Sequence, residues 1–204
     1  MTSHIPFAIM MEMTELTPTE DIYTAEQCFI STASGRKFYL SNPEFYIPDI
    51  AHALAMNCRF NGHCTQFFSV AEHSVIIAQM MEHFNEGNPL EGLLHDATEA
   101  YLSDIPAPFK QNFRELALFD KELDSKFRQV FGLPIKCSKE CKKYDWICLY
   151  IEEYWLSSPH CESKFSDPFG YRPIALEIAE KFKPKCLSPK EGKLAFLEMY
   201  EKLK

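Results

Sequence analysis

The sequence lacks any hydrophobic run that approaches the roughly 20 residues a membrane-spanning helix needs. Its opening stretch, MTSHIPFAIM, also lacks a basic segment followed by a long apolar one, so it does not resemble a secretion signal. These two absences argue against an integral membrane protein and against an exported one. We therefore predict a cytoplasmic protein with no membrane partner.

An excess of basic residues is missing as well. The 204 residues include 21 Lys and Arg against 29 Asp and Glu, which gives a formal net charge of −8. Nucleic acids and anionic membranes are bound by basic surfaces, so this balance argues against both as partners. A small anion bound at one local site is still compatible with the composition.

Cysteine is plentiful, but none of the eight cysteines belongs to a C-x-x-C pair. Because that spacing is a common signature of zinc and dithiol sites, its absence disfavours both. In a reducing cytoplasm we expect most of these thiols to be free and to pack as small apolar residues. A zinc site that includes Cys137 and Cys141 is an alternative, although no second pair of ligands is evident.

The composition predicts one folded domain with an aromatic-rich interior. Hydrophobic residues make up 46% of the chain and include 17 Phe, 9 Tyr and 2 Trp, which is sufficient for one compact core. The only strand signal is CFISTASGRKFYL at 28–40, where two short apolar runs flank Ala33-Ser34-Gly35. We predict an all-α helical bundle with this small N-terminal β-hairpin. Residues 1–26 are expected to form an N-terminal arm before a single domain at 27–204.

Helix start signals and apolar periodicity divide that domain further. Asn88-Pro89-Leu90-Glu91 and Ser188-Pro189-Lys190-Glu191 each combine a capping residue, a Pro at the first helical position and a Glu at the third. The motif core is expected at 48–156, followed by an irregular segment and a last helix within 157–204. The expected helices cover 49–60, 65–84, 88 to a point before Pro106, 113–131, 138–156 and 188 to the C-terminus.

The stretch LLHDATEAYLSDIPAPFK, residues 93–110, sets polar side chains into a helical apolar pattern. Burying carboxyls beside an imidazole is costly unless something pairs with them. His95 and Glu99 are four residues apart and share a helical face, with Asp96 about 100° away around the helix. Asp104 follows the expected end of the helix. We infer that these side chains gather over one point.

Two more polar residues lie on apolar helical faces. His73 shares its face with Ser69 and Ile77, and Asp145 lies among aromatic residues of a later helix. Two imidazoles and two carboxylates suit a divalent transition metal and leave positions open for water and substrate. Each residue also has a simpler reading. His73 alone would be a hydrogen-bonded core histidine, and Asp145 alone would pair with Lys142 or an arginine.

The ordered set of motifs resembles the HD-domain metal-dependent phosphohydrolases over roughly residues 27–155. HDATEA at 95–100 followed by SDIPAPFK at 103–110 is most similar to the bacterial 5′-deoxynucleotidases. The earlier segments PDIAHALAMNCRFNGH and FFSVAEHS are more similar to a group that includes phage dATP triphosphohydrolases. The dipeptide HD alone is weak evidence for this family, whereas the whole ordered set of motifs is strong evidence for the resemblance.

The resemblance implies a role for each matching residue. A divalent ion (Zn, Mn, Co, Fe or Mg) would be held by His73, His95, Asp96 and Asp145. The catalytic residues would be Glu99, Asp104 and Arg59, with Arg59 and Lys110 at the phosphate. Phe60, Ile105, Pro106 and Phe109 flank these positions and are candidates for enclosing the base, although each would serve equally well in the core. Arg59 and Lys110 also have simpler readings, as a helix C-terminal cation and as an exposed lysine.

The expected activity is hydrolysis of a 2′-deoxynucleotide, and the favoured version releases triphosphate from dATP. The main alternative is a 5′-nucleotidase that releases phosphate from a deoxynucleoside monophosphate. Two further functions are less favoured, namely a nucleotide-sensing HD module without turnover and a cyclic-nucleotide phosphodiesterase. The expected partner is a small-molecule deoxynucleotide in the cytoplasm, which would be the host cytoplasm for a phage protein. Self-association into a homo-oligomer is left open.

Overall fold

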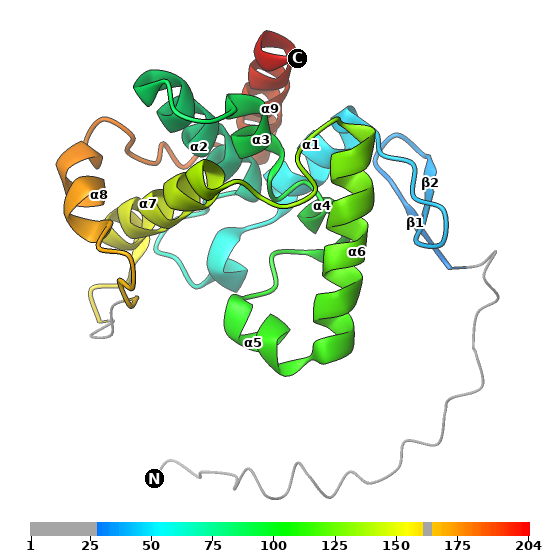
Figure 1. Cartoon of the computed structure of the whole chain (residues 1–204), viewed down its shortest axis with the longest axis horizontal. Coiled ribbons are helices and arrows are strands. Elements are labelled where there is room, and N and C mark those ends of the chain that lie inside the picture. Colours follow the sequence, from blue (N-terminus) through cyan, green and yellow to red (C-terminus); the bar gives the residue numbers. More distant parts are fainter. Residues whose placement is uncertain (1–27, 161–164) are drawn as a thin grey trace, which may run out of the picture.

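The computed structural model describes residues 28–160 and 165–204 (Figure 1). The N-terminal arm expected at 1–26 lies outside these ranges. Within them the protein is an all-α bundle with one small two-stranded hairpin near its N-terminal end, which confirms the predicted fold class. In the described ranges, every helix is too short or too polar to cross a lipid bilayer.

The described part of the chain contains the following helices. They are α1 (Ile47–Met56), α2 (Val70–Phe84), α3 (Pro89–Leu94), α4 (Glu99–Leu102), α5 (Ala107–Asn112), α6 (Arg114–Val130), α7 (Lys139–Leu156), α8 (Arg172–Ile178) and α9 (Pro189–Leu203), with a 3₁₀ turn, η2, at Arg59–Gly62. The hairpin and α8 lie at opposite ends of the molecule, and α2 lies between them (Figure 1).

The hairpin pairs β1 (Phe29–Ser31) with β2 (Lys37–Tyr39) in antiparallel register, with Ile30 opposite Phe38. Asp49 of α1 holds its turn in place. The buried carboxylate of Asp49 accepts hydrogen bonds from Thr32 Oγ1 at 2.8 Å and from Ser34 N and Oγ at 2.9 and 2.7 Å. This clasp attaches a two-stranded element that would be marginal by itself.

The core consists of two apolar clusters that share α2. Val75 and Ala78 of α2 belong to the cluster formed with α1, α3 and α9, whereas Ile77 and Met80 belong to the cluster formed with α7 and α8. A helix that is apolar on both sides belongs in the interior, and α2 is buried along most of its length. A Cβ at Gly92 would lie 2.6 Å from Met81 Sδ and 3.0 Å from Ile77 Cγ2, so a larger residue there would force these α2 side chains to shift.

Several predicted helix boundaries were wrong. The first helix ends at Met56 rather than at residue 60, because Asn57 turns away and Cys58 pairs with Ser69 as a short β-bridge. Helix α2 begins at Val70 rather than at residue 65, since the Ser69 side chain caps it by accepting from Glu72 N at 3.2 Å. The short helices α5 and α8 were not predicted. The capping box predicted at Ser188 and Glu191 is present.

Candidate metal centre

The helix predicted from residue 88 to a point before Pro106 is divided into α3 and α4 by a tight turn at residues 95–98. The hydrogen bonds of this turn join residues three apart, from Glu99 N to Asp96 O at 3.0 Å and from Ala97 N to Leu94 O at 3.2 Å. This tighter winding changes which side chains share a face. His95 and Asp96 now approach one point, with Nε2 and Oδ2 3.1 Å apart.

His73 and His95 present their Nε2 atoms to the same point from α2 and from the end of α3. Both side chains are buried, and their rings lie 5.2 Å apart between centroids. Each Nδ1 atom has a partner on the far side of the ring. His73 Nδ1 lies 2.5 Å from Glu152 Oε1, and His95 Nδ1 lies 2.9 Å from the carbonyl oxygen of Gly92. These contacts leave both Nε2 atoms directed at the shared point.

Two carboxylates complete the group. Asp96 Oδ2 lies 3.6 Å from His73 Nε2, and Asp145 Oδ1 lies 3.4 Å from His73 Nε2 and 3.8 Å from His95 Nε2. The Asp145 side chain is 42% exposed, so the group opens to solvent on the α7 side. His73, His95 and Asp145 bring donor atoms close enough to one another to bind a metal ion.

The two Nε2 atoms are buried and have no hydrogen bond of acceptable geometry among the described residues. An orphaned buried polar atom is costly, and two in one place point to a group that both would contact. Two nitrogens and two carboxylate oxygens at these separations form a donor set for a divalent cation. The residues therefore fit a metal ion.

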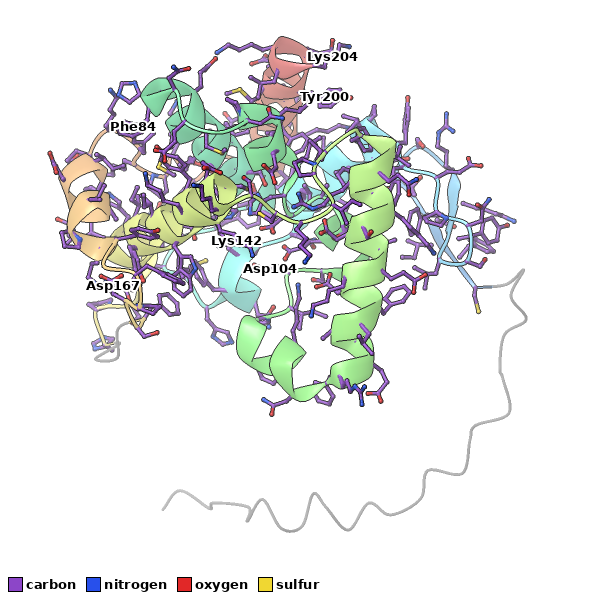
Figure 2. All side chains as sticks on the ribbon, viewed as in Figure 1. Phe84, Asp104, Lys142, Asp167, Tyr200 and Lys204 are labelled. Atoms are coloured by element: carbon purple, nitrogen blue, oxygen red, sulfur yellow. The ribbon has the colours of Figure 1, made fainter. Side chains whose placement is uncertain are left out.

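Arg59 approaches the same point from the η2 turn. Its buried guanidinium lies 3.7 Å from Asp96 Oδ2 and 3.8 Å from Asp104 Oδ2 through Nη1, and 3.2 Å from Glu152 Oε2 through Nη2. Figure 2 shows Asp104 close to this turn, which is drawn in cyan. Arg59 is thus a buried cation beside the donor set.

The remaining predicted polar residues lie on the α4–α5 side. Glu99 is buried, its Oε1 lies 3.6 Å from Lys110 Nζ, and its Oε2 has no hydrogen-bond partner in the described part of the chain. Lys110 also lies 3.3 Å from Asp120 Oδ2 of α6. The side chains of Glu99 and Lys110 therefore meet beside Asp104 without entering the group formed by the two histidines.

The charges of the group shift its pKa values strongly. Burial alone would lower the pKa of His95, but the carboxylates of Asp96 and Asp145 outweigh it and raise the pKa to about 10. The pKa of Asp96 is lowered because His95, His73 and Arg59 outweigh the effect of burial. Burial and the neighbouring charges of Asp96 and Asp104 raise the pKa of Glu99 well above its usual value. The metal-free group thus favours imidazolium beside ionised Asp96, and a protonated Glu99.

The four apolar residues predicted near the base are less closely gathered. The guanidinium carbon of Arg59 lies 5.4 Å from the centre of the Phe60 ring. The centres of the Phe60 and Phe165 rings are 6.2 Å apart. Ile105 and Pro106 are half-buried in the link between α4 and α5. Phe109 on α5 is 59% exposed, so its side chain is not a core residue.

Sequence reasoning missed Glu152. This carboxylate of α7 is fully buried, and it joins His73 to Arg59 through its two oxygen atoms. The opposing charges outweigh burial and lower its pKa to about 2. Its spacing held a signal, because Glu152 follows Asp145 by seven residues and so lies on the same face of α7.

Other candidate groupings differ from this one. Glu91, Cys137 and Cys141 also bring donor atoms together, but Glu91 Oε1 already accepts from Arg128 Nη1 at 3.0 Å and from Ser138 N at 2.9 Å. A cavity of about 340 Å³ lies between the hairpin, α1 and α4, and none of the predicted site residues lines it. Asp49, which lines this cavity, accepts hydrogen bonds from Thr32 and Ser34. In contrast, the buried Nε2 atoms of His73 and His95 have no hydrogen bond among the described residues.

Comparison with known proteins gives two relatives. The chain is 39% identical over 127 residues to the uncharacterized protein YfdR of Escherichia coli K12, a match that covers 61% of this chain and 70% of YfdR. It is 38% identical over 114 residues to an uncharacterized protein of Rhodobacter capsulatus, with 50% of this chain and 57% of that protein covered. No protein-family model matches the sequence.

Proposed function

This chain belongs to the same family as YfdR of Escherichia coli, and we propose that it is a divalent-metal-dependent phosphohydrolase of 2′-deoxynucleotides. One observation carries the proposal. The Nε2 atoms of His73 and His95 are buried without hydrogen-bond partners among the described residues, and they face the carboxylates of Asp96 and Asp145. The proposed ligands are these four side chains.

A bound divalent cation would make water more acidic and would polarise a phosphoryl oxygen. The donor set of imidazole and carboxylate suits Zn, Mn, Co or Fe, and Mg is a further candidate. The partial exposure of Asp145 leaves an approach for substrate from solvent. His73 and His95 are held by bonds at their Nδ1 atoms, which fixes their tautomers and orients the rings.

The residues around the ligands supply the functions that phosphoryl transfer needs. Arg59 presents a guanidinium whose Nε has no partner within the described ranges, and a planar set of donors suits a phosphate oxygen. Lys110 adds a second positive charge beside Glu99. With a protonated carboxyl, Glu99 would donate a proton to the departing 5′-oxygen. Asp104 would position the attacking water.

The favoured substrate class is a deoxynucleoside triphosphate, with dATP first, on the resemblance of the segment around Arg59. The alternative is a deoxynucleoside monophosphate, which the SDIPAPFK segment favours. The charges near the site also support the alternative. Lys110 is already paired with Glu99 and Asp120, so less positive charge is left for a triphosphate than for a monophosphate, which carries fewer negative charges. Both reactions break a bond at the same 5′-oxygen, so the same residues would serve either.

The deciding experiment offers all common dNTPs and dNMPs to the protein with Mn²⁺, Co²⁺, Zn²⁺ or Mg²⁺ added singly. Phosphorus NMR then distinguishes tripolyphosphate from orthophosphate. We expect metal-dependent release of tripolyphosphate from dATP, and Glu99→Gln should abolish it without loss of metal. A matched control is Glu198→Gln, since Glu198 is exposed on α9. Nucleotide-stabilised melting without any product would instead support the sensing module and end the enzyme proposal.

A further inference from the structure

Two cysteines lie on either side of the turn that carries Arg59. Cys58 precedes the η2 turn and Cys64 follows it, and their Sγ atoms are 3.6 Å apart. Both side chains are half-buried, so a small solute can reach them. Cys64 Sγ also lies 3.9 Å from the carbonyl oxygen of Arg59. The thiols of Cys58 and Cys64 are thus in contact with each other at the two ends of the η2 turn.

The backbone on both sides of this turn is fixed. Arg59 N donates to Phe68 O at 2.9 Å, and Thr65 N donates to Leu156 O at 2.9 Å. Between these anchors, Phe60 and Asn61 adopt φ angles of 56° and 51°, which non-glycine residues rarely take. Cys58 lies directly before the first of these hydrogen bonds and Cys64 directly before the second. An approach of their sulfur atoms therefore acts on the segment that carries Arg59.

We propose that Cys58 and Cys64 form a reversible disulfide that controls the position of Arg59. A disulfide needs its sulfur atoms about 2 Å apart, so the two thiols must close by about 1.5 Å from their present separation of 3.6 Å. The oxidant is a peroxide, of which hydrogen peroxide is the simplest. No metal or nucleotide is needed for the bond to form.

The reaction balances with one peroxide for each disulfide. The Cys58 thiol loses its proton and its sulfur attacks a peroxide oxygen. The O–O bond breaks, a sulfenic acid forms, and the departing hydroxide takes up a proton and leaves as the first water. The Cys64 sulfur then attacks the sulfenic sulfur and expels hydroxide, which leaves as the second water with the Cys64 proton. Burial and the hydrogen bond with Cys58 raise the pKa of Cys64 to about 11, so Cys64 still carries the proton that it gives up in the second step. Two electrons pass from the thiols to the peroxide.

Closing the ring is expected to displace Arg59 relative to its partners. Its Nη1 atom lies 3.7 Å from Asp96 and 3.8 Å from Asp104, so a movement of about 1 Å would change both distances and the electrostatic interactions that depend on them. This consequence rests on the proposed function, in which Arg59 binds phosphate. The disulfide itself does not rest on it.

Trypsin provides a direct test, because the Arg59–Phe60 bond lies inside the proposed ring. Cleavage after Lys37, Arg59 and Lys110 gives peptides 38–59 and 60–110, and each contains a single cysteine. After peroxide treatment, alkylation of free thiols and digestion without reductant, we expect these two peptides to be joined. Dithiothreitol should separate them, and Cys58→Ser should prevent the link.

The exposed Cys28, in peptide 1–36, shows whether the oxidant has acted. If Cys28 is oxidised while peptides 38–59 and 60–110 stay separate and alkylated, the proposed disulfide is wrong. Cys137 and Cys141 provide an internal comparison, since their link would join peptides 137–139 and 140–142. A link between those two peptides without one between Cys58 and Cys64 would also overturn the proposal.

A second measurement tests control of Arg59. If the protein hydrolyses a deoxynucleotide, we expect peroxide to lower kcat/KM at least fivefold, dithiothreitol to restore it, and Cys64→Ser to be insensitive. An unchanged kcat/KM in fully linked protein would overturn control of Arg59. If no form of the protein hydrolyses a substrate, the proposed function fails, and the peptide map still decides the disulfide.

Discussion

Glu152 Oε1 lies 2.5 Å from His73 Nδ1, and its other oxygen lies 3.2 Å from Arg59 Nη2. A single buried carboxylate thus touches both a candidate metal ligand and the candidate phosphate-binding arginine. It orients the imidazole so that Nε2 faces the donor group, and it offsets the charge of a guanidinium buried beside that group. The candidate metal site and the candidate phosphate site are therefore physically linked through this carboxylate.

Replacing Glu152 with Gln should weaken metal binding by about 10- to 100-fold. The amide keeps the size of the side chain but loses the negative charge that supports His73 and Arg59. Isothermal titration with Mn²⁺ or Co²⁺ measures the change, and circular dichroism verifies that the variant is folded. Glu198→Gln serves as the matched control on an exposed part of α9. Wild-type metal affinity in Glu152→Gln would show that the carboxylate does not orient a ligand.

Much of the site could be predicted from the sequence, because its residues carry their own signals. A histidine on an apolar helical face and an aspartate among aromatic residues both need a partner, and the structure brings His73 and Asp145 together. Glu152 was missed although it shares a helical face with Asp145. Its partners lie 79 and 93 residues away in the chain, and no local pattern reveals such contacts.

The break between α3 and α4 was the clearest error of the sequence-based description. Apolar periodicity through Leu93, Leu94 and Ala97 predicts one continuous helix, and local propensity does not oppose it. The chain beside the turn at 95–98 is also held by tertiary contacts, such as the bond from Asn57 Nδ2 to Glu99 O at 3.0 Å. Boundaries set by distant partners are outside the reach of local patterns.

Asp145→Asn should abolish metal binding while leaving the fold intact. The Asp145 side chain is 42% exposed, so its replacement removes a ligand without leaving a cavity. We expect the free energy of unfolding to change by about 1 kcal/mol or less, the usual scale for a partly exposed ion pair. Metal titration and urea unfolding of the metal-free protein measure the two quantities. Full metal affinity in this variant would exclude Asp145 as a ligand.

Metal binding should release protons at pH 8. The neighbouring carboxylates outweigh burial and raise the pKa of His95 to about 10, so the metal-free protein carries a proton there that a metal must displace. Apparent metal affinity should therefore rise with pH up to this pKa. Calorimetric titration in two buffers of different ionisation enthalpy gives the number of protons released. Identical enthalpies in both buffers would mean that His95 is already neutral or does not bind the metal.

Asp49→Asn should destabilise the protein by about 2 kcal/mol at pH 7, the usual scale for hydrogen bonds to a charged group. Asp49 is 5% exposed, and its carboxylate accepts from Thr32 and Ser34. An amide in its place retains one acceptor, so the hairpin would lose part of its attachment to α1. Urea unfolding of both proteins gives the difference in the free energy of unfolding.

The difference in the free energy of unfolding between wild type and Asp49→Asn should depend on pH, because the Asp49 carboxyl titrates. Burial would raise its pKa, but the hydrogen bonds from Ser34 and Thr32 and the charge of Arg36 outweigh burial, so that the folded-state pKa is lowered. A lowered pKa contributes stability at pH values above the unfolded-state pKa, and this contribution is lost as pH falls through the folded-state pKa. The gap between wild type and Asp49→Asn should therefore be full at pH 7 and should narrow below about pH 4. A gap that stays constant from pH 7 to pH 3 would show that the clasp does not depend on the ionised carboxylate.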